Sequence, residues 1–215
     1  MTSAVDAAID DPLPPSVPRN AGHSVPAAAL RDRRTANWVR SHGISVTACD
    51  DRDLDLVRSY GIRSRQVIFR CPAAPATLRR ADDLGVSRFV VTTGAQLTRL
   101  ATCAGRNHYV YLDDDAPLML GDPKVKVIGL HTRVDDQDWA GSARKLVARS
   151  AVLLACGSMV RRIMLSGGPV ELWLDVNCDR ARQIVADVDA AVRAEAEYWH
   201  VPSPAVSMAA LSTGN

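Results

Sequence analysis

Apolar and polar residues alternate along the chain in short blocks with different periods. Blocks whose apolar residues recur at every third or fourth position predict helices, and compact runs of Val, Ile, Phe and Tyr predict strands. The segment DRDLDLVRSYG places Leu54, Val57 and Tyr60 at near-helical spacing and then ends at a glycine. The segment QVIFRC, which follows, is a compact apolar run typical of a buried strand.

The whole chain repeats this alternation of helix and strand. The predicted helices cover residues 30–43, 51–61, 75–85, 95–105, 140–157 and 180–199. The predicted strands cover residues 44–49, 66–71, 88–93, 108–112, 124–132, 161–168 and 204–210. Alternating apolar strands and helices indicate an α/β fold, with a parallel sheet that is covered by helices.

Two architectures fit this alternation, a (β/α)8 TIM-type barrel and an open, doubly wound sheet. In the first half of the chain, one unit of strand and helix recurs roughly every 20 to 25 residues, which favours the barrel. No GxGxxG or Walker motif indicates a nucleotide-binding doubly wound sheet. We therefore predict a (β/α)8 barrel.

The N-terminal segment, residues 1–28, contains five prolines and no sustained apolar period. Such a composition predicts a flexible, Pro-rich arm, and residues 29–215 would then form the barrel domain. A first strand is expected to be incomplete or irregular, because Pro26 lacks the N–H that a central strand donates to its neighbour.

Composition excludes several classes of protein. The 215 residues include 47% hydrophobic and 23% charged residues, with a net charge of +2, so we expect neither a nucleic-acid nor a membrane partner. The five cysteines form no CxxC pair, which indicates no metal site and no disulfide framework. Since no signal peptide is recognisable, a reducing cytoplasm is the expected location.

Several segments, taken in order, resemble the barrel domain of the fold-type III pyridoxal-phosphate decarboxylases. Diaminopimelate decarboxylase is the most similar, and ornithine decarboxylase and alanine racemase are more distant. VIGLHTRVDDQ resembles the family's VGLHSHIGSQ, RRIMLSGGPV resembles LDLGGGF, and HVPSPAVSMAA resembles the final barrel strand. The resemblance spans roughly residues 28–210.

In that family, pyridoxal phosphate binds at the C-terminal ends of the strands. A lysine at the end of strand one forms the Schiff base, a histidine stacks on the ring, and the glycine-rich loop holds the phosphate. The resemblance therefore implies a cofactor site at His131, Arg133, Ser166, Gly167 and Gly168. Arg133 stands in the position of the stacking histidine.

The chemistry of the family needs groups that this sequence lacks. No lysine occurs near strand one, and the three lysines are Lys124, Lys126 and Lys145. Lys126 precedes His131 by five residues, or about 16 Å along a strand, and Lys145 is expected on the solvated side of a helix. We also expect the family's β-rich second domain to be absent, so we assign no catalytic residue.

We therefore expect a catalytically inactive homologue with a binding or regulatory role and without pyridoxal phosphate. The alternative is a pyridoxal-phosphate-dependent amino-acid decarboxylase or racemase-like subunit that obtains its lysine and second domain from a full-length partner. Unpaired barrel edges at an incomplete strand one would favour homo- or hetero-oligomers.

Each candidate residue also has a purely structural interpretation. His131 fits a hydrogen-bonded histidine at a strand end better than a ligand, and Arg133 fits a loop ion pair with Asp135 or Asp136. The pair Gly167–Gly168 fits a turn. Runs of carboxylates at 50–53 and 113–115 fit turns and helix N-caps better than metal sites.

Overall fold

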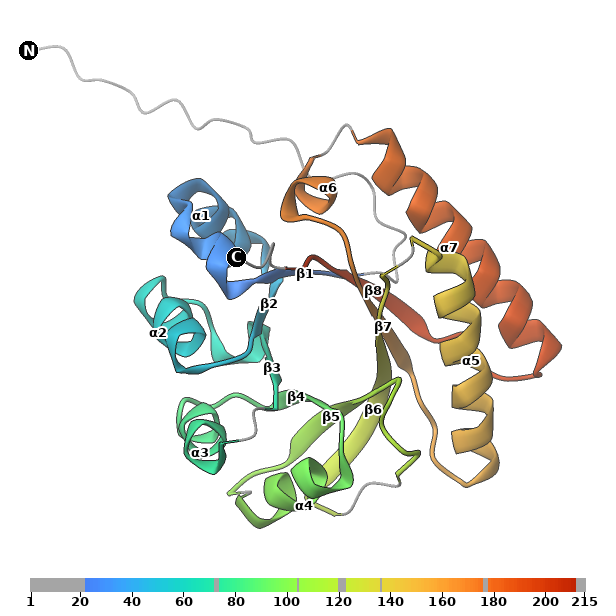
Figure 1. The fold of residues 1–215 in the computed structure, drawn as a ribbon, viewed down its shortest axis with the longest axis horizontal. Coiled ribbons are helices and arrows are strands. Elements are labelled where there is room, and N and C mark those ends of the chain that lie inside the picture. Colours follow the sequence, from blue (N-terminus) through green and yellow to red (C-terminus); the bar gives the residue numbers. More distant parts are fainter. Residues whose placement is uncertain are drawn as a thin grey trace, which may run out of the picture.

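Eight parallel strands close into a barrel in sequence order (Figure 1). The computed structural model describes residues 22–71, 74–103, 105–119, 123–135, 137–175 and 178–211. The strands are β1 Gly22–Pro26, β2 Ser45–Ala48, β3 Val67–Arg70, β4 Arg88–Val91, β5 His108–Asp113, β6 Val125–Arg133, β7 Arg162–Ser166 and β8 Ala205–Ala209. The predicted (β/α)8 barrel is confirmed, and the alternative prediction of an open, doubly wound sheet is wrong.

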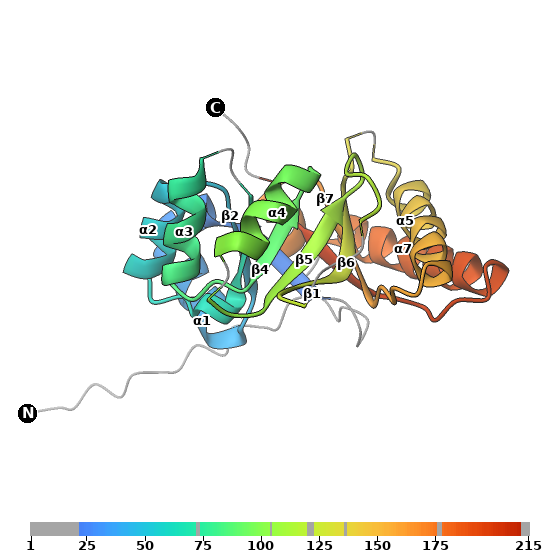
Figure 2. The same ribbon diagram turned by 90° about the horizontal axis from the view of Figure 1, so that it is seen from below.

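Helices surround the ring of strands (Figures 1 and 2). They are α1 Arg33–His42, α2 Asp51–Ser59, α3 Pro75–Asp83, α4 Gly94–Cys103, α5 Trp139–Ala155, α6 Val170–Leu174 and α7 Asp179–Tyr198, with short 3-10 helices at Ala27–Arg31 and Ser64–Gln66. The long helices α5 and α7 lie side by side (Figure 1). In the described part of the chain, no helix connects β5 to β6 or follows β8.

Strand β1 closes the barrel, contrary to the prediction that strand one would be incomplete. It pairs with β2 through Ser24 and Ser45 and with β8 through Ser24 and Ala209. Pro26 is tolerated because it is the last residue of the strand, where the missing N–H interrupts little of the ladder. The expected unpaired edges are therefore absent from the described residues. Residues 22–28, assigned to the arm, belong to the barrel, and residues 1–21 lie outside the described residues.

The core has two parts. The larger part lies between the strands and the helices. The smaller part fills the middle of the barrel with Ile68, Val90, Tyr111, Met164 and Ala209. The two ends of the barrel interior are polar, and the inner core between them separates two potential sites.

A glycine makes room for the largest side chain of the inner core. A Cβ atom at Gly129 would lie 2.4 Å from Cδ1 of Tyr111, its partner across the β5–β6 ladder. The ring of Tyr111 therefore occupies the space that a side chain on β6 would need.

The aspartates around residue 50 cap a helix, as expected. Asp50 accepts a hydrogen bond from the N–H of Asp53 at 2.8 Å and so caps α2. Asp53 accepts one from the N–H of Cys49 at 2.8 Å. Within the described ranges, no group of three His, Cys, Asp or Glu side chains could hold a metal ion.

Two further observations concern the described residues. Cys49, Cys71, Cys156 and Cys178 are free thiols. None of the helices described is both long and apolar enough to span a bilayer.

Candidate functional site

Polar side chains from four strands meet inside the C-terminal end of the barrel. Arg70, Asp113 and Ser166 each come two residues after a member of the inner core on the same strand. Because side chains on a strand alternate between its two faces, all three lie on the inner face. His131, near the end of β6, completes the group.

His131 is the centre of a buried hydrogen-bond network. Its Nδ1 lies 2.8 Å from Oδ2 of Asp113, and its Nε2 lies 2.8 Å from Oγ of Ser166 and 3.1 Å from Nη2 of Arg70. The histidine is fully buried, and this burial lowers its pKa although the bond to Asp113 opposes the change. A neutral imidazole therefore donates from Nδ1 to Asp113, and its Nε2 accepts from Ser166 and Arg70. These are the local hydrogen bonds expected for a strand-end histidine.

The chain of contacts Asp113–His131–Ser166 has the connectivity of a serine hydrolase triad. Its surroundings argue against nucleophilic chemistry. Ser166 is only 4% exposed and does not line the neighbouring cavity. The N–H of Gly167 donates to the carbonyl of Ala209 at 2.8 Å, so it is not available as an oxyanion donor. The network therefore holds the strand ends together rather than presenting a nucleophile.

A cavity of about 430 Å³ opens above this network, at the ends of β3 to β6. Its lining residues are Arg70, Cys71, Val90, Thr92, Asp113, Asp114, Asp115, Thr132, Arg133 and Asp135. Burial raises the pKa of Cys71 to about 12, so its thiol stays protonated at neutral pH.

The carboxylates of the cavity differ in their partners. Asp114 is paired with Lys145 and, at 2.8 Å, with Arg149. Asp115 is exposed and forms no ion pair with any described residue. Asp115 is therefore the carboxylate most available to a ligand.

Arg133 faces solvent rather than a cofactor ring. Its side chain is 60% exposed, and its Nε lies 2.6 Å from Oδ1 of Asp135. This is the loop ion pair that the sequence favoured for Arg133 and Asp135. Asp136, the other carboxylate of that prediction, lies outside the described residues.

The turn at Gly167 and Gly168 is filled by tryptophan rings. A Cβ on Gly167 would lie 2.7 Å from Cη2 of Trp139 and 2.9 Å from the carbonyl oxygen of Val134. Trp173 donates from Nε1 to the carbonyl of Gly167 at 2.8 Å, and Trp139 and Trp173 pack edge to face. Gly168 has a φ of 69°, which explains the second glycine as a turn residue.

These residues do not fit pyridoxal phosphate. The rings of Trp139 and Trp173 occupy the turn that would hold its phosphate. The last residue of β1 is Pro26, whereas the Schiff base needs a lysine at the end of strand one. No lysine lines the cavity, although Lys145 reaches its rim through Asp114. Lys126 is the second residue of β6 and lies at the opposite end of the barrel. This agrees with the prediction from its position five residues before His131. Schiff-base chemistry needs a lysine amine at the site, so no reaction step through this cofactor follows from the geometry.

The predicted site residues are thus only partly brought together. His131 and Ser166 share one network, whereas Arg133, Gly167 and Gly168 lie outside it. Arg70 and Asp113 were missed as contacts of His131. The available signal was that Arg70 is the next-to-last residue of the predicted strand 66–71 and that Asp113 directly follows the predicted strand 108–112.

Comparison with known proteins identifies the fold. No family model matches the chain, and no curated protein matches its sequence. Among solved structures, diaminopimelate decarboxylase from M. jannaschii has a TM-score of 0.72 and 12% identity, over 89% of this chain and 53% of that one. Lysine decarboxylase from Selenomonas ruminantium has a TM-score of 0.66 and 14% identity, over 89% of this chain and 55% of that one.

The same fold occurs in a viral member of the group. Arginine decarboxylase from Paramecium bursaria Chlorella virus has a TM-score of 0.68 and 12% identity, over 89% of this chain and 57% of that one. This chain spans about half the length of each of these enzymes. It therefore has the barrel fold that occurs in diaminopimelate, lysine and arginine decarboxylases.

Proposed function

We propose that the C-terminal mouth of the barrel binds a small amine or amino acid, and that the chain performs no Schiff-base decarboxylation itself. One observation carries this proposal. Arg70, Asp113 and Asp115 line one cavity, and no lysine lines it. The protein is then a binding or regulatory homologue of the decarboxylases.

The charges of the cavity favour a ligand with an ammonium group. Asp114 and Asp135 are neutralised by neighbouring cations, which leaves Asp113 and Asp115 against the single guanidinium of Arg70. An ammonium group gains energy near such carboxylates. A carboxylate on the same ligand could pair with Arg70, so an amino acid would match both signs of charge.

Similar structures suggest suitable probes. Diaminopimelate decarboxylases from M. jannaschii and Helicobacter pylori were solved with L-lysine, and the Chlorella virus arginine decarboxylase was solved with agmatine. A cavity of about 430 Å³ is within the usual range for such small molecules.

Calorimetric titration with L-lysine, cadaverine and L-norleucine tests the proposal. L-norleucine has the length of lysine but lacks its side-chain ammonium group. We expect L-lysine and cadaverine to bind more tightly than L-norleucine. Asp115→Asn should weaken the binding of L-lysine about tenfold because a charged contact is lost. Asp83→Asn removes an exposed carboxylate on α3 and is the matched control. Equal affinity for all three ligands would refute the proposal.

A second experiment tests the absence of Schiff-base chemistry. The protein is incubated with pyridoxal phosphate, reduced with borohydride and digested for mass spectrometry. We expect no site-specific modification of Lys124, Lys126 or Lys145. A stoichiometric adduct on one lysine, particularly Lys145 at the cavity rim, would favour the decarboxylase alternative.

That alternative needs a partner chain, which stays a prediction, as does a cytoplasmic location. A full-length decarboxylase would have to supply the lysine and the second domain. Stable co-elution of such an enzyme with this chain in size-exclusion chromatography, with cofactor bound to the complex, would support it.

A further inference from the structure

The N-terminal end of the barrel, opposite the candidate site, carries a cluster of basic residues. A cavity of about 530 Å³ opens there. Its lining residues include Arg65, Arg88, Lys126, Arg161 and Arg162, and no carboxylate lines it. Five cations around one concave surface form a strongly positive site in a chain whose net charge is only +2.

Strand register creates this cluster, which we call the basic cleft. Arg88, the first residue of β4, pairs with Tyr109 of β5, which pairs with Lys126 of β6. Arg162 is the first residue of β7. The basic residues therefore lie at or near the beginnings of different strands, and they meet because the barrel places these beginnings at one end.

Two of the arginines also reach into the barrel. Arg88 and Arg162 each lie two residues before an inner-core residue on their strands, so they share its inner face. Both line a small inner cavity of about 90 Å³, together with Ser24, Ser45 and Ser207. The basic cleft thus continues inward into a pocket lined by hydroxyl groups.

Arg88 is only partly satisfied. Its Nη2 donates to Oγ of Ser45 at 3.3 Å and to the carbonyl of Arg65, but its buried Nε has no hydrogen-bond partner. Burial lowers the pKa of Arg88; the nearby Tyr111 opposes this change, whereas the charge of Arg162 adds to it. A bound anion would accept a hydrogen bond from this Nε and would stabilise the charged form of Arg88.

The other four cations are exposed, and none has a described counter-ion. Arg65, Lys126, Arg161 and Arg162 form no ion pair with any residue that the structure describes. Since like charges repel, such a group is costly to assemble without an anion. At the opposite end of the barrel, by contrast, Arg149 and Lys145 are both paired with Asp114.

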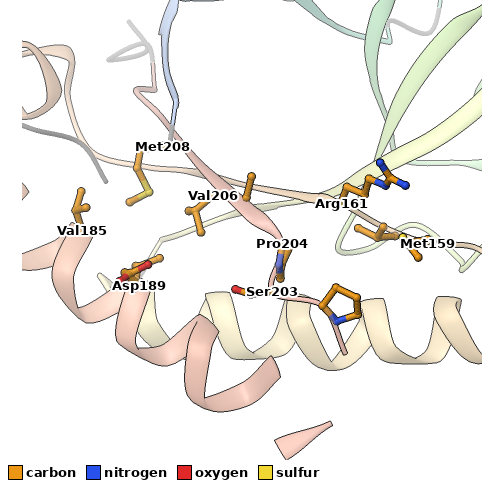
Figure 3. A pocket seen from close by; sticks show the side chains of 12 residues that line it. Met159, Arg161, Val185, Asp189, Ser203, Pro204, Val206 and Met208 are labelled. Atoms are coloured by element: carbon orange, nitrogen blue, oxygen red, sulfur yellow. The ribbon is translucent and has the colours of Figure 1, made fainter. Parts of the chain in front are cut away.

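An apolar cavity adjoins the basic cleft. It has a volume of about 470 Å³ and lies between α7, the segment before β7, and β8 (Figure 3). Met159 and Arg161 line both cavities and lie at one end of the apolar one, whereas Val185 and Met208 lie at the other end. Asp189, its only carboxylate, is paired with Arg193 at 2.8 Å.

We propose that the N-terminal end of the barrel binds a small phosphate ester, with its charged head in the basic cleft and an apolar organic part in the adjoining cavity. Guanidinium groups bind phosphate oxygens in two-point contacts, which suits Arg161, Arg162 and Arg88. The apolar cavity, bounded by valine, methionine and proline side chains, suits a hydrocarbon chain better than a polar group. The basic residues surround one concave opening, which suits a compact anion better than an extended nucleic acid.

Calorimetry on the full chain with three diphosphates tests this proposal. Pyrophosphate carries no organic group, ADP carries a nucleoside and geranyl diphosphate carries an apolar chain. We expect all three to bind, with geranyl diphosphate the tightest. Arg161→Gln/Arg162→Gln should weaken all three about tenfold or more. Arg33→Gln/Arg34→Gln removes two adjacent exposed arginines on α1 and is the matched control.

A second variant separates the head of the ligand from its chain. Val185→Asn places a polar group in the apolar cavity and should weaken geranyl diphosphate but leave pyrophosphate unchanged. If the double arginine variant does not fold, Lys126→Gln, at an exposed position, tests the head group in its place. Equal weakening by the control pair, no binding of any diphosphate, or tighter binding of a single-stranded DNA oligonucleotide would overturn the proposal. Equal affinity for the three diphosphates would overturn the role of the apolar cavity.

Discussion

The histidine of the C-terminal mouth shows how burial and hydrogen bonding decide the state of a single residue. His131 is fully buried, and Asp113, Ser166 and Arg70 engage both of its ring nitrogens. A buried polar group without a hydrogen bond costs free energy, so these contacts stabilise the fold. The main role of His131 is therefore to stabilise the fold, because it does not line the cavity above it.

This burial predicts a dependence of stability on pH. The pKa of His131 is lower in the folded chain than the ordinary value of about 6.5. Below that pH the unfolded chain binds a proton that the folded chain excludes, so the free energy of unfolding falls as the pH falls. The loss is at most about 1.4 kcal/mol per pH unit for one histidine.

Urea unfolding of the wild type and of His131→Asn, over a pH range from about 7.5 down to about 5.5, measures this contribution. We expect the variant to be less stable but to lose less stability on acidification. His200→Asn, at an exposed position, should keep the wild-type slope. Identical slopes for wild type and His131→Asn would contradict a neutral, buried imidazole.

A second prediction at this scale concerns Ser166. Ser166→Ala removes one donor to Nε2 of His131, whereas Arg70 still donates there. We expect the free energy of unfolding to fall by about 1 kcal/mol. A fluorophosphonate probe, which labels nucleophilic serines, should leave the wild-type Ser166 unmodified. Rapid labelling at Ser166 would instead show a reactive triad.

At the scale of elements, the turn between β7 and α6 is packed against two tryptophan side chains. The resemblance to the decarboxylases implied a phosphate-binding loop at Gly167 and Gly168. Instead, the loop packs under Trp139 from the start of α5 and Trp173 from α6. The glycines are explained by this close approach and by a positive φ at Gly168.

Gly167→Ala tests that explanation. The added Cβ would meet Trp139 and the carbonyl of Val134 at less than van der Waals distance. We expect a loss of about 1–3 kcal/mol in the free energy of unfolding, measured in urea, because the packed ring must move. Gly105→Ala is the control, since nothing lies within 4 Å of a Cβ there. Equal stability of the two variants would contradict tight packing at the turn.

At the scale of the whole molecule, the barrel has polar groups at both ends and a thin apolar layer between them. The C-terminal end presents paired charges and Asp115, whereas the N-terminal end presents unpaired cations. The two proposed sites are thus of opposite character and lie at opposite ends of one sheet. Both ends belong to one closed ring of strands, in which β1 joins β2 to β8.

Truncation tests the importance of this closure. A chain that starts at residue 22 keeps β1, whereas a chain that starts at residue 28 leaves β2 and β8 as open edges. We expect the longer chain to unfold cooperatively and the shorter one to lose cooperativity or to aggregate. Near-ultraviolet circular dichroism and size-exclusion chromatography measure both outcomes. A cooperative, monomeric shorter chain would refute the role assigned to β1.

The alternation of helices and strands was readable from the sequence because it depends on local periodicity. Seven strands and the order of the barrel followed from apolar runs such as QVIFRC. The first strand, GHSVP, was expected to be incomplete or irregular, because it has one β-branched residue and ends in proline. Its place in the barrel depends on pairing with β2 and β8, which are distant in sequence.

The sequence by itself therefore determined the fold class, the position of His131 at a strand end and the lack of a lysine near strand one. Only the tertiary structure decided what these residues contact. Arg70 and His131 are 61 positions apart, and closure of the barrel alone brings them within 3.1 Å. The basic cleft arises in the same way, since its residues lie at or near the beginnings of different strands. Local patterns specify which face of a strand is buried, but contacts between strand ends depend on register around the whole barrel.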